Sequence, residues 1–238
     1  MSLVEALLDL LFPPTCISCG SHQIADSKIM LCQTCRGELE PISGPLCSCC
    51  GIPFTAATNN DHLCGLCLTN HFHFDRARAV LRYKPPLTEI ISRFKYHGQR
   101  TGLKTFRALQ QQSTHLTEPT HPELIIPVPL HRKRLQERGF NQALVLARTF
   151  YPDDRGIIDF LTLIRQRHTD PQTGLSGKAR RRNLKNSFMV IDEEKVKGKR
   201  VILVDDVFTT GTTVSECARV LKKAGANKVD VLTLARVV

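Results

Sequence analysis

The chain has 238 residues, of which 42% are hydrophobic, and this is enough for one large domain or two smaller ones with a packed core. Its formal net charge is +11, but residues 1–70 contain six acidic and only two basic residues, so the positive charge is concentrated in residues 71–238. A basic surface attracts phosphate groups, either of a small ligand or of a nucleic acid. No stretch approaches the roughly 20 apolar residues that span a bilayer, and the start lacks the basic segment of a signal peptide. We therefore expect a cytoplasmic protein without a transmembrane segment.

The first residues are expected to form a short amphipathic helix. Its apolar face contains Leu3, Leu7, Leu10 and Leu11. Pro13 and Pro14 end it, because proline cannot continue a helix. We expect this face to pack onto the same chain rather than to anchor the protein in a membrane.

Cysteine dominates the next segment, residues 13–70. Eight of the ten cysteines form four C-x-x-C pairs, namely Cys16/Cys19, Cys32/Cys35, Cys47/Cys50 and Cys64/Cys67. Both thiolates of such a pair can reach one metal ion at ~2.3 Å, so four pairs provide the ligands of two tetrahedral zinc sites. The simplest grouping joins the first two pairs in one site and the last two in another. An interleaved grouping, or replacement of a neighbour by Cys49, is also possible from the sequence.

The zinc, one ion or two, is expected to be structural. Four thiolate ligands leave no open coordination position, and a segment with so few large apolar residues needs a staple in order to fold. A disulfide framework is the less favoured alternative, because nothing indicates secretion and cytosolic thiols stay reduced. His62 is interpreted as a solvated loop residue. We thus predict an N-terminal helix and a zinc-ribbon domain over residues 1–70, followed by a second domain over residues 71–238.

One strand and two helices are predicted for residues 71–123. The strand covers residues 78–83, and a helix follows it. The apolar face of this helix consists of Leu87, Ile90, Ile91 and Phe94. A basic–aromatic cluster, either a solvated helix end or a ligand contact, follows at Lys95, Tyr96, Gly98 and Arg100. The second helix is expected over residues 103–111, and a surface loop over residues 113–123.

Most of the positive charge follows in residues 124–200. Residues 124–130 are predicted to form a buried strand, which leads into a basic loop and then a helix. The basic residues of that connection are Arg132, Lys133 and Arg134. A longer segment, residues 165–185, is here called the basic loop, and its basic residues are Arg165, Arg167, Lys178, Arg180, Arg181, Arg182 and Lys185. Its glycines and proline predict mobility, so it can close over a charged intermediate or lie along a nucleic-acid backbone.

A sugar-phosphate site is predicted at residues 201–213. Residues 201–204 indicate a buried strand of a parallel sheet, followed by Asp205 and Asp206. A loop of small residues precedes the next helix and consists of Thr209, Thr210, Gly211, Thr212 and Thr213, here called the threonine loop. Hydroxyls and backbone N–H groups at a helix N-terminus suit a phosphate, and two carboxylates suit vicinal sugar hydroxyls or a magnesium ion reached through water. An ATPase strand is excluded because the chain has no P-loop sequence.

This stretch resembles the motif that binds phosphoribosyl pyrophosphate (PRPP) in the type I phosphoribosyltransferases. The resemblance implies that Asp205 and Asp206 hold the ribose hydroxyls and that the threonine loop binds the 5′-phosphate. It implies Mg²⁺ on the pyrophosphate. It also makes the basic residues of 132–134 candidates for pyrophosphate binding, with a solvated charge run as the alternative.

Further motifs resemble the ComF (ComFC/GntX) family. They are LLFPPTCISCG near the start, FKYHG, PVPLHRKRLQERGFNQA, VILVDDVFTTGTT, and the spaced residues Arg167, Thr169, Gln172, Leu175, Arg180 and Asn183. That family joins an N-terminal zinc-ribbon region to a phosphoribosyltransferase domain. The implied fold is therefore α/β, a type I phosphoribosyltransferase-like, mostly parallel sheet with flanking helices, preceded by a small zinc-ribbon domain.

Two functions are implied by the resemblance. As a competence protein, the chain handles incoming single-stranded DNA in natural transformation together with a ComFA-type helicase in the cytosol, and PRPP is a ligand or regulator. The seven basic residues of the basic loop are then the predicted DNA contacts. Alternatively, the protein is an active phosphoribosyltransferase whose acceptor, a nucleobase or a related compound, is not identified by any residue. The first function is favoured.

Overall fold

The computed structural model describes residues 13–22, 24–26, 28–54, 60–97, 101–116, 121–167 and 184–238. The predicted N-terminal helix and most of the basic loop lie outside these residues, including Lys178, Arg180, Arg181 and Arg182. The elements are β1 (Ile24–Asp26), β2 (Ile29–Cys32), α2 (Gln33–Gly37), α3 (Gly65–Thr69), β3 (Arg76–Arg82), α4 (Leu87–His97), α5 (Leu103–Gln112), η1 (Thr114–Leu116), β4 (Leu124–Pro127), α6 (Arg132–Arg138), α7 (Gln142–Phe150), η2 (Arg155–Ile157), β5 (Leu163–Arg165), β6 (Phe188–Val190), β7 (Arg200–Phe208), α9 (Thr212–Lys223) and β8 (Lys228–Arg236). Within the described part of the chain, no helix is long and apolar enough to cross a membrane.

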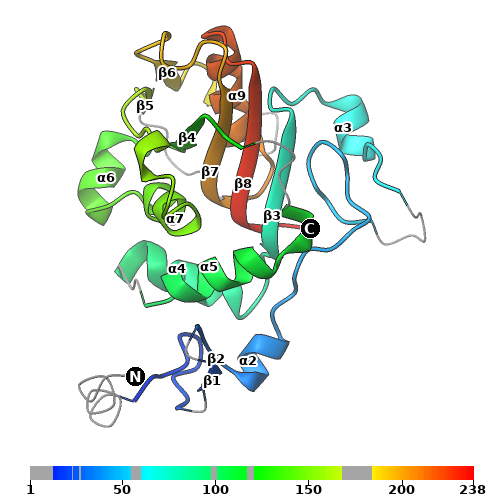
Figure 1. The fold of residues 1–238 in the computed structure, drawn as a ribbon, viewed down its shortest axis with the longest axis vertical. Helices are drawn as coiled ribbons and strands as arrows, with labels where there is room; N and C mark the ends of the chain where they lie inside the picture. Colours follow the sequence, from blue (N-terminus) through cyan, green and yellow to red (C-terminus); the bar gives the residue numbers. More distant parts are fainter. Residues whose placement is uncertain are drawn as a thin grey trace.

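A four-stranded parallel sheet forms the centre of the molecule (Figure 1). Its strand order is β3–β8–β7–β4, and every neighbouring pair is parallel. The central strands β7 and β8 are buried along most of their length, as expected for strands that are covered on both faces. The α/β fold with a parallel sheet and flanking helices is thus confirmed. Because all four strands run the same way, the connections that follow β4 and β7 start from the same edge of the sheet.

Two separate cores cover the two faces of this sheet. Ile202 and Val204 of β7 enter the core under α4, α5 and α7, here called the α7-side core. Val201 and Leu203 enter the core under α9, here called the α9-side core. This division follows from the alternation of side chains along a strand. The predicted helices at residues 87–97 and 103–112 both lie on the α7 side.

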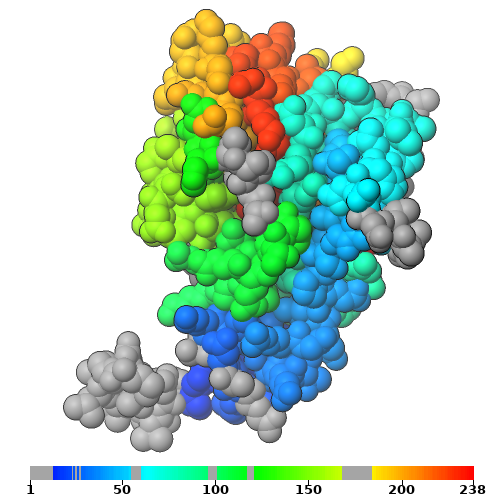
Figure 2. All heavy atoms as spheres, turned by 45° about the vertical axis from the view of Figure 1, so that its right-hand side comes forward, coloured from blue at the N-terminus to red at the C-terminus, as the bar shows by residue number. Residues whose placement is uncertain are grey.

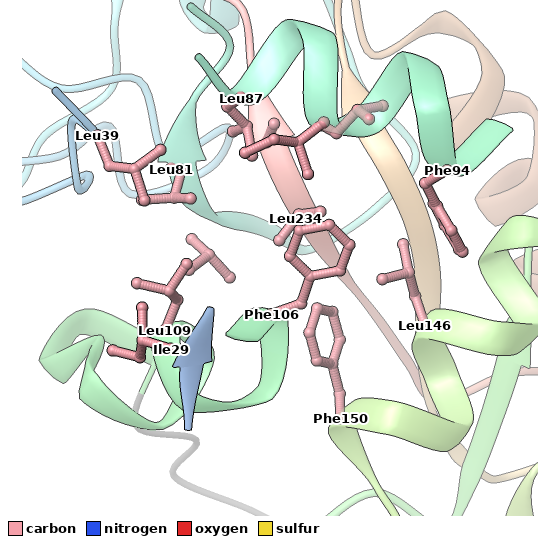
Figure 3. Close-up of a cluster of buried hydrophobic side chains, with 14 of the residues drawn as sticks. Ile29, Leu39, Leu81, Leu87, Phe94, Phe106, Leu109, Leu146, Phe150 and Leu234 are labelled. Atoms are coloured by element: carbon pink, nitrogen blue, oxygen red, sulfur yellow. The ribbon is translucent and has the colours of Figure 1, made fainter. Parts of the chain in front are cut away.

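The first two C-x-x-C pairs lie in a segment that shares the α7-side core. Ile29 of β2 is fully buried and lies next to Leu109 of α5, and Leu39 lies next to Leu81 of β3 (Figure 3). The backbone N–H of Met30 donates to the hydroxyl of Thr105 in α5 at 2.9 Å. This segment therefore packs into the same hydrophobic core as α5 and β3 and does not form a core of its own.

The last two C-x-x-C pairs lie in a segment that shares the α9-side core. Cys47 and Cys50 pack there with Phe74, and the N–H of Ala77 in β3 donates to the carbonyl of Cys49 at 2.7 Å. In Figure 2 the two cysteine segments occupy different ends of one face, with the darker blue residues near the bottom and the cyan residues at the upper right. The domain boundary at residue 70 stays a prediction.

Three features differ from the sequence-based expectations at the sheet edge. β7 does not end at Val204 but continues to Phe208, because Asp205 and the residues after it keep their pairing with β8. Residues 132–138 form the helix α6 rather than a loop; the imidazole of His131 caps it, and Gly139 ends it with a φ of 74°. α9 begins at Thr212, two residues earlier than expected.

The antiparallel pair β5–β6 was not predicted, because strands of three residues carry too little periodicity to be recognised. Its register pairs Arg165 with Phe188. The two ends of the basic loop are therefore joined by a strand pair, and β6 packs on α9.

Candidate functional site

The first two C-x-x-C pairs meet in a first cysteine cluster, formed by Cys16, Cys19, Cys32 and Cys35. Their sulfur atoms all lie within 4.8 Å of one another, and those of Cys19 and Cys32 are 3.7 Å apart. Arg93 of α4 donates to the carbonyl oxygens of Ile17 and Ser18 at 3.1 and 2.9 Å. The turn between the first two ligands is thus attached to the helix that covers the sheet.

The remaining pairs meet in a second cysteine cluster, formed by Cys47, Cys50, Cys64 and Cys67. The sulfurs of Cys50 and Cys64 are also 3.7 Å apart. Arg78 of β3 donates to the carbonyl oxygens of Cys47 and Ser48 at 3.3 and 3.4 Å. The structure therefore forms the simplest of the predicted groupings, and the interleaved grouping is not formed.

Both clusters fit a zinc ion. Around tetrahedral zinc with bonds of ~2.3 Å, two sulfurs lie ~3.8 Å apart, and both measured separations match this value. Burial acts to raise the pKa of Cys47, but the N–H groups of Cys64 and Cys50 donate to its sulfur at 3.3 and 3.4 Å, and the pKa is lowered to about 6. The thiolate of Cys47, which is the form that binds metal, is thereby favoured, whereas burial raises the pKa of Cys50 in the same cluster to about 11. All ten cysteines are free of disulfides.

Neither Cys49 nor His62 belongs to the clusters of the described residues. Cys49 is half-buried and its sulfur is outside the second cysteine cluster. His62 is exposed, and its ring stacks on that of Phe54 with centroids 3.9 Å apart. His62 is thus a surface residue, as expected.

Asp205 and Asp206 lie within β7, so their side chains point to opposite faces of the sheet. Asp206 is only 5% exposed, and its Oδ2 is 2.8 Å from Nζ of Lys95 in α4. Asp205 lies on the other side, where burial and the negative charge of Asp205 raise the pKa of the Cys217 thiol in α9. Burial and the charge of Asp206 raise the pKa of Asp205 to about 7, although Lys95 and Arg165 oppose this effect. The two carboxylates therefore lie in different environments.

Lys95 is a site residue that the sequence analysis left undecided between a solvated helix end and a ligand contact. Its side chain is only 21% exposed, and it neutralises Asp206. A signal was available, because Lys95 follows the buried Ile91 by four residues and so lies on the same helical face. A cation at this position of an apolar face indicates a buried carboxylate opposite.

The threonine loop depends on the glycine at its centre. Gly211 has a φ of 72° and is the N-cap of α9. A Cβ at this position would lie 2.6 Å from the ring of Phe208 and 3.0 Å from that of Phe72. Glycine is therefore required here both by the left-handed backbone and by the close approach of the rings.

The hydroxyls of the threonine loop lie around the N-terminus of α9. Thr209 and Thr210 are exposed, and the hydroxyl oxygens of Thr210 and Thr212 are 2.8 Å apart. Thr213 is half-buried in the first turn of the helix. The first N–H groups of a helix have no partner within it and carry its positive dipole end, so this arrangement suits an anion.

Only some of the predicted basic residues lie near the aspartate pair. Burial lowers the pKa of Arg165 in β5, and the nearby guanidinium of Arg134 in α6 lowers it further. The positive charge of Arg165 in turn acts to lower the pKa of Asp205. Arg132 and Lys133 are exposed on the first turn of α6. Arg165 and its neighbour Arg134 are thus guanidinium groups on the Asp205 side of the sheet.

Arg167 and Lys185 are exposed at the two ends of the basic loop. Arg165 differs from them, because its guanidinium is 5.4 Å from the ring centroid of Phe188 and its side chain is half-buried. The position of Arg165 therefore favours a contact with the candidate site over a contact with DNA.

Comparison with known proteins agrees with this architecture. Residues 7–68 match the double zinc ribbon domain family, and residues 146–237 match the phosphoribosyl transferase domain family. Competence protein F of Haemophilus influenzae is 36% identical over 232 residues, which cover 93% of this chain and 96% of that protein. DNA utilization protein YhgH of Escherichia coli (strain K12) is 36% identical over 196 residues, 80% of this chain and 84% of that protein. Competence protein ComFC of Bacillus subtilis is 28% identical over 215 residues, 89% and 85% of the two chains. The chain therefore belongs to the ComF family of competence and DNA utilization proteins, which combines a double zinc ribbon with a phosphoribosyltransferase domain.

Proposed function

We propose that the protein handles incoming single-stranded DNA in natural transformation and that it binds PRPP with Mg²⁺ at the threonine loop and the aspartate pair. The observation that carries the second part is the turn at Gly211, which brings exposed threonine hydroxyls and the N-terminus of α9 directly after the aspartates of β7. A phosphate at that helix terminus and a ribose beside Asp205 match the order of groups in a sugar phosphate.

The neighbouring charges support the same ligand. Lys95 neutralises Asp206, so the site does not carry two unbalanced carboxylates that would repel a pyrophosphate. Arg134 and Arg165 lie on the Asp205 side, where planar guanidinium groups can bind phosphate oxygens in pairs. Mg²⁺ supplies further positive charge on the pyrophosphate when it is bound. In this proposal Arg132 and Lys133, exposed on α6, contact the outer phosphate oxygens.

Calorimetric titration of PRPP and Mg²⁺ tests the ligand. Saturable binding is expected with the wild type, and its loss is expected in the double variant Asp205→Asn/Asp206→Asn. Asp192→Asn is a matched control, because this aspartate lies on a connection outside the sheet and pairs with Lys195 at 3.9 Å. Absence of binding to the wild type would remove PRPP from the proposal.

The DNA part of the proposal rests on membership of the family and on the positive charge outside the cysteine segments. Arg167 and Lys185 frame the basic loop and are exposed, as backbone contacts must be. If about four phosphates are contacted, the log–log slope of affinity against salt is about −3, at ~0.7 per phosphate of a single strand. Fluorescence anisotropy of a labelled oligonucleotide at increasing NaCl measures this slope, and a slope near zero contradicts the proposal.

A triple variant tests the basic loop directly. Arg180→Ala/Arg181→Ala/Arg182→Ala is expected to weaken DNA binding, and unchanged affinity would exclude this part of the loop as the DNA surface. We place this activity in the cytosol, with a ComFA-type helicase as partner. Co-purification with such a helicase in the presence and absence of single-stranded DNA checks that association.

An active phosphoribosyltransferase is the alternative function, and the match of residues 146–237 to the phosphoribosyl transferase domain family favours it. In that case Arg134 and Arg165 stabilise the charge that develops on the leaving pyrophosphate. Pyrophosphate release from PRPP in the presence of a panel of nucleobases distinguishes turnover from binding alone.

A further inference from the structure

Arg236, the last residue of β8, is a buried cation that the proposed site does not use. It is only 4% exposed. Its guanidinium contacts carbonyl oxygens, a sulfur and an aromatic ring, and no carboxylate of the described residues forms an ion pair with it. A buried charge without a counter-charge is strongly unfavourable. The structure therefore has to balance Arg236 in some other way.

The polar partner of Arg236 is the second cysteine cluster. Its Nη1 donates to the carbonyl oxygen of Cys50, and its Nη2 is 4.0 Å from the sulfur of the same residue. Its Nε donates to the carbonyl of Val237 at 3.4 Å. A zinc ion with four thiolate ligands has a net charge of −2, so metal in this cluster would provide the missing negative charge. This is a contact to the outside of the metal site, of the kind that orients ligands and tunes metal affinity.

The guanidinium of Arg236 also contacts an aromatic ring next to the threonine loop. It lies 4.7 Å from the ring centroid of Phe208, the last residue of β7. The same ring meets Phe74 edge-on at 6.0 Å, and it is the ring that a Cβ at Gly211 would approach to 2.6 Å. Phe208 is thus held between Arg236 and the turn that starts α9. Movement of the ring would move the backbone from which the threonine hydroxyls project.

We propose that Arg236 is a positioning residue that connects the second cysteine cluster to the threonine loop. Its guanidinium is the buried counter-charge of the metal-loaded thiolates, and through Phe208 it fixes the turn at Gly211. Loading of the second cluster with zinc therefore orders the threonine loop. The consequence for phosphate binding rests on the proposed function, but the link between cluster and loop does not.

The test uses Arg236→Gln in the full-length, zinc-loaded protein, with Arg200→Gln as control. Arg200 is a strand arginine of β7 at the opposite end of the sheet, where it pairs with Glu123. Zinc release to a chromophoric chelator is measured first. Release of one of the two zinc ions is expected to be about 10–100-fold faster in Arg236→Gln, as for other residues that contact metal ligands, and unchanged in the control. Release kinetics equal to the wild type would overturn the proposal.

Hydrogen exchange of the amides of residues 208–213 is the second readout, and it needs no ligand. Faster exchange is expected in Arg236→Gln and not in Arg200→Gln, and unaltered exchange would overturn the link to the loop. Arg236→Lys keeps the charge but loses the planar donor pair, so its exchange rate is expected to lie between those of Arg236→Gln and Arg200→Gln. If Arg236→Gln does not fold, the same exchange is followed in the wild type during stepwise zinc removal, where protection of residues 208–213 must fall with one zinc ion and not with the other.

PRPP affinity is the third readout. A loss of affinity in Arg236→Gln that parallels the loss of protection in residues 208–213 supports the full proposal. If the wild type binds no PRPP, the proposed ligand is wrong, and the zinc-release and exchange measurements still decide the role of Arg236.

Discussion

The two cysteine clusters have the same ligands and similar turns, but they are attached to the sheet in different ways. In each, an arginine donates to two carbonyl oxygens of the first C-x-x-C turn: Arg93 in the first cluster and Arg78 in the second. Arg93 is exposed and comes from α4, whereas the side chain of Arg78 is 11% exposed and comes from β3. Only the second cluster has in addition the buried Arg236.

The ligand sequence therefore determines each metal site, while its packing determines which part of the molecule it supports. The first cluster joins the α7-side core and reaches the candidate site through α4, which carries both Arg93 and Lys95. The second joins the α9-side core and reaches the site through Phe208. Each cluster therefore supports a different half of the same site, the first on the Asp206 side and the second on the threonine-loop side.

The largest expected effect is the loss of a buried ligand of the second cluster. Metal analysis of the wild type should give two zinc ions per chain, and Cys50→Ser and Cys19→Ser should each remove one. Cys50 is 1% exposed, whereas Cys19 is exposed. Structural zinc is worth several kcal/mol or more of folding free energy. We expect urea unfolding to show a clearly larger loss of unfolding free energy for Cys50→Ser than for Cys19→Ser. Equal losses would contradict the inferred difference between the two clusters.

The pair formed by Lys95 and Asp206 gives the next largest effect. Lys95→Met leaves a buried carboxylate unpaired and is expected to cost about 3 kcal/mol, most of which the second change Asp206→Asn should restore. Lys84→Met is a matched control, because Lys84 has an equally short contact of 2.8 Å to Glu40 but both side chains are about half exposed. Its cost should stay below about 1 kcal/mol. Similar costs for the two lysines would show that burial does not distinguish them.

A smaller difference is expected between the two arginines that hold the turns. Arg78→Gln removes a guanidinium whose side chain is only 11% exposed and which donates to the carbonyls of Cys47 and Ser48, and it is expected to cost about 2 kcal/mol. Arg93→Gln removes an exposed arginine whose hydrogen bonds water can replace, and it should cost about 0.5 kcal/mol. Chemical denaturation of both variants measures the two values. A larger cost for Arg93→Gln than for Arg78→Gln would contradict the inference that the turn of the second cluster depends more strongly on its arginine.

The pH dependence of PRPP affinity is the smallest expected effect. Asp205 faces Arg165 and Cys217, with Asp206 and Lys95 beside it, and its pKa is raised to about 7. Its ionised fraction therefore rises about tenfold between pH 6 and pH 8. The ionised carboxylate accepts hydrogen bonds from the ribose hydroxyls, so affinity should rise with pH by up to this factor.

Asp205→Asn is the control for this pH effect. PRPP itself titrates in both proteins, so only the difference between the two profiles reports Asp205, and parallel profiles would exclude it. Stability should show the opposite sign. Between the ordinary pKa of an aspartate and about 7, the folded state holds a proton that the unfolded state has lost, so the free energy of unfolding falls as pH rises.

Much of the architecture could be predicted from local patterns. The C-x-x-C spacings predicted both clusters, apolar runs predicted β4 and β7, a looser alternation predicted β3, and the 3.6-residue period predicted α4, α5 and α9. These features were accessible because each depends on residues that are close together in the sequence.

The arrangement of the site was decided only by the tertiary structure. β7 continues through Asp205 and Asp206 because its pairing with β8 extends as far as Phe208, and this sends the two carboxylates to opposite faces. Lys95 and Arg236 acquire their roles from partners 111 and 186 positions away in the chain, Asp206 and Cys50. No local pattern encodes such distances, because burial and charge pairing arise when segments meet. Local sequence patterns thus show which chemical groups are present, and the packing of both cysteine segments against the sheet brings together the groups that act as one site.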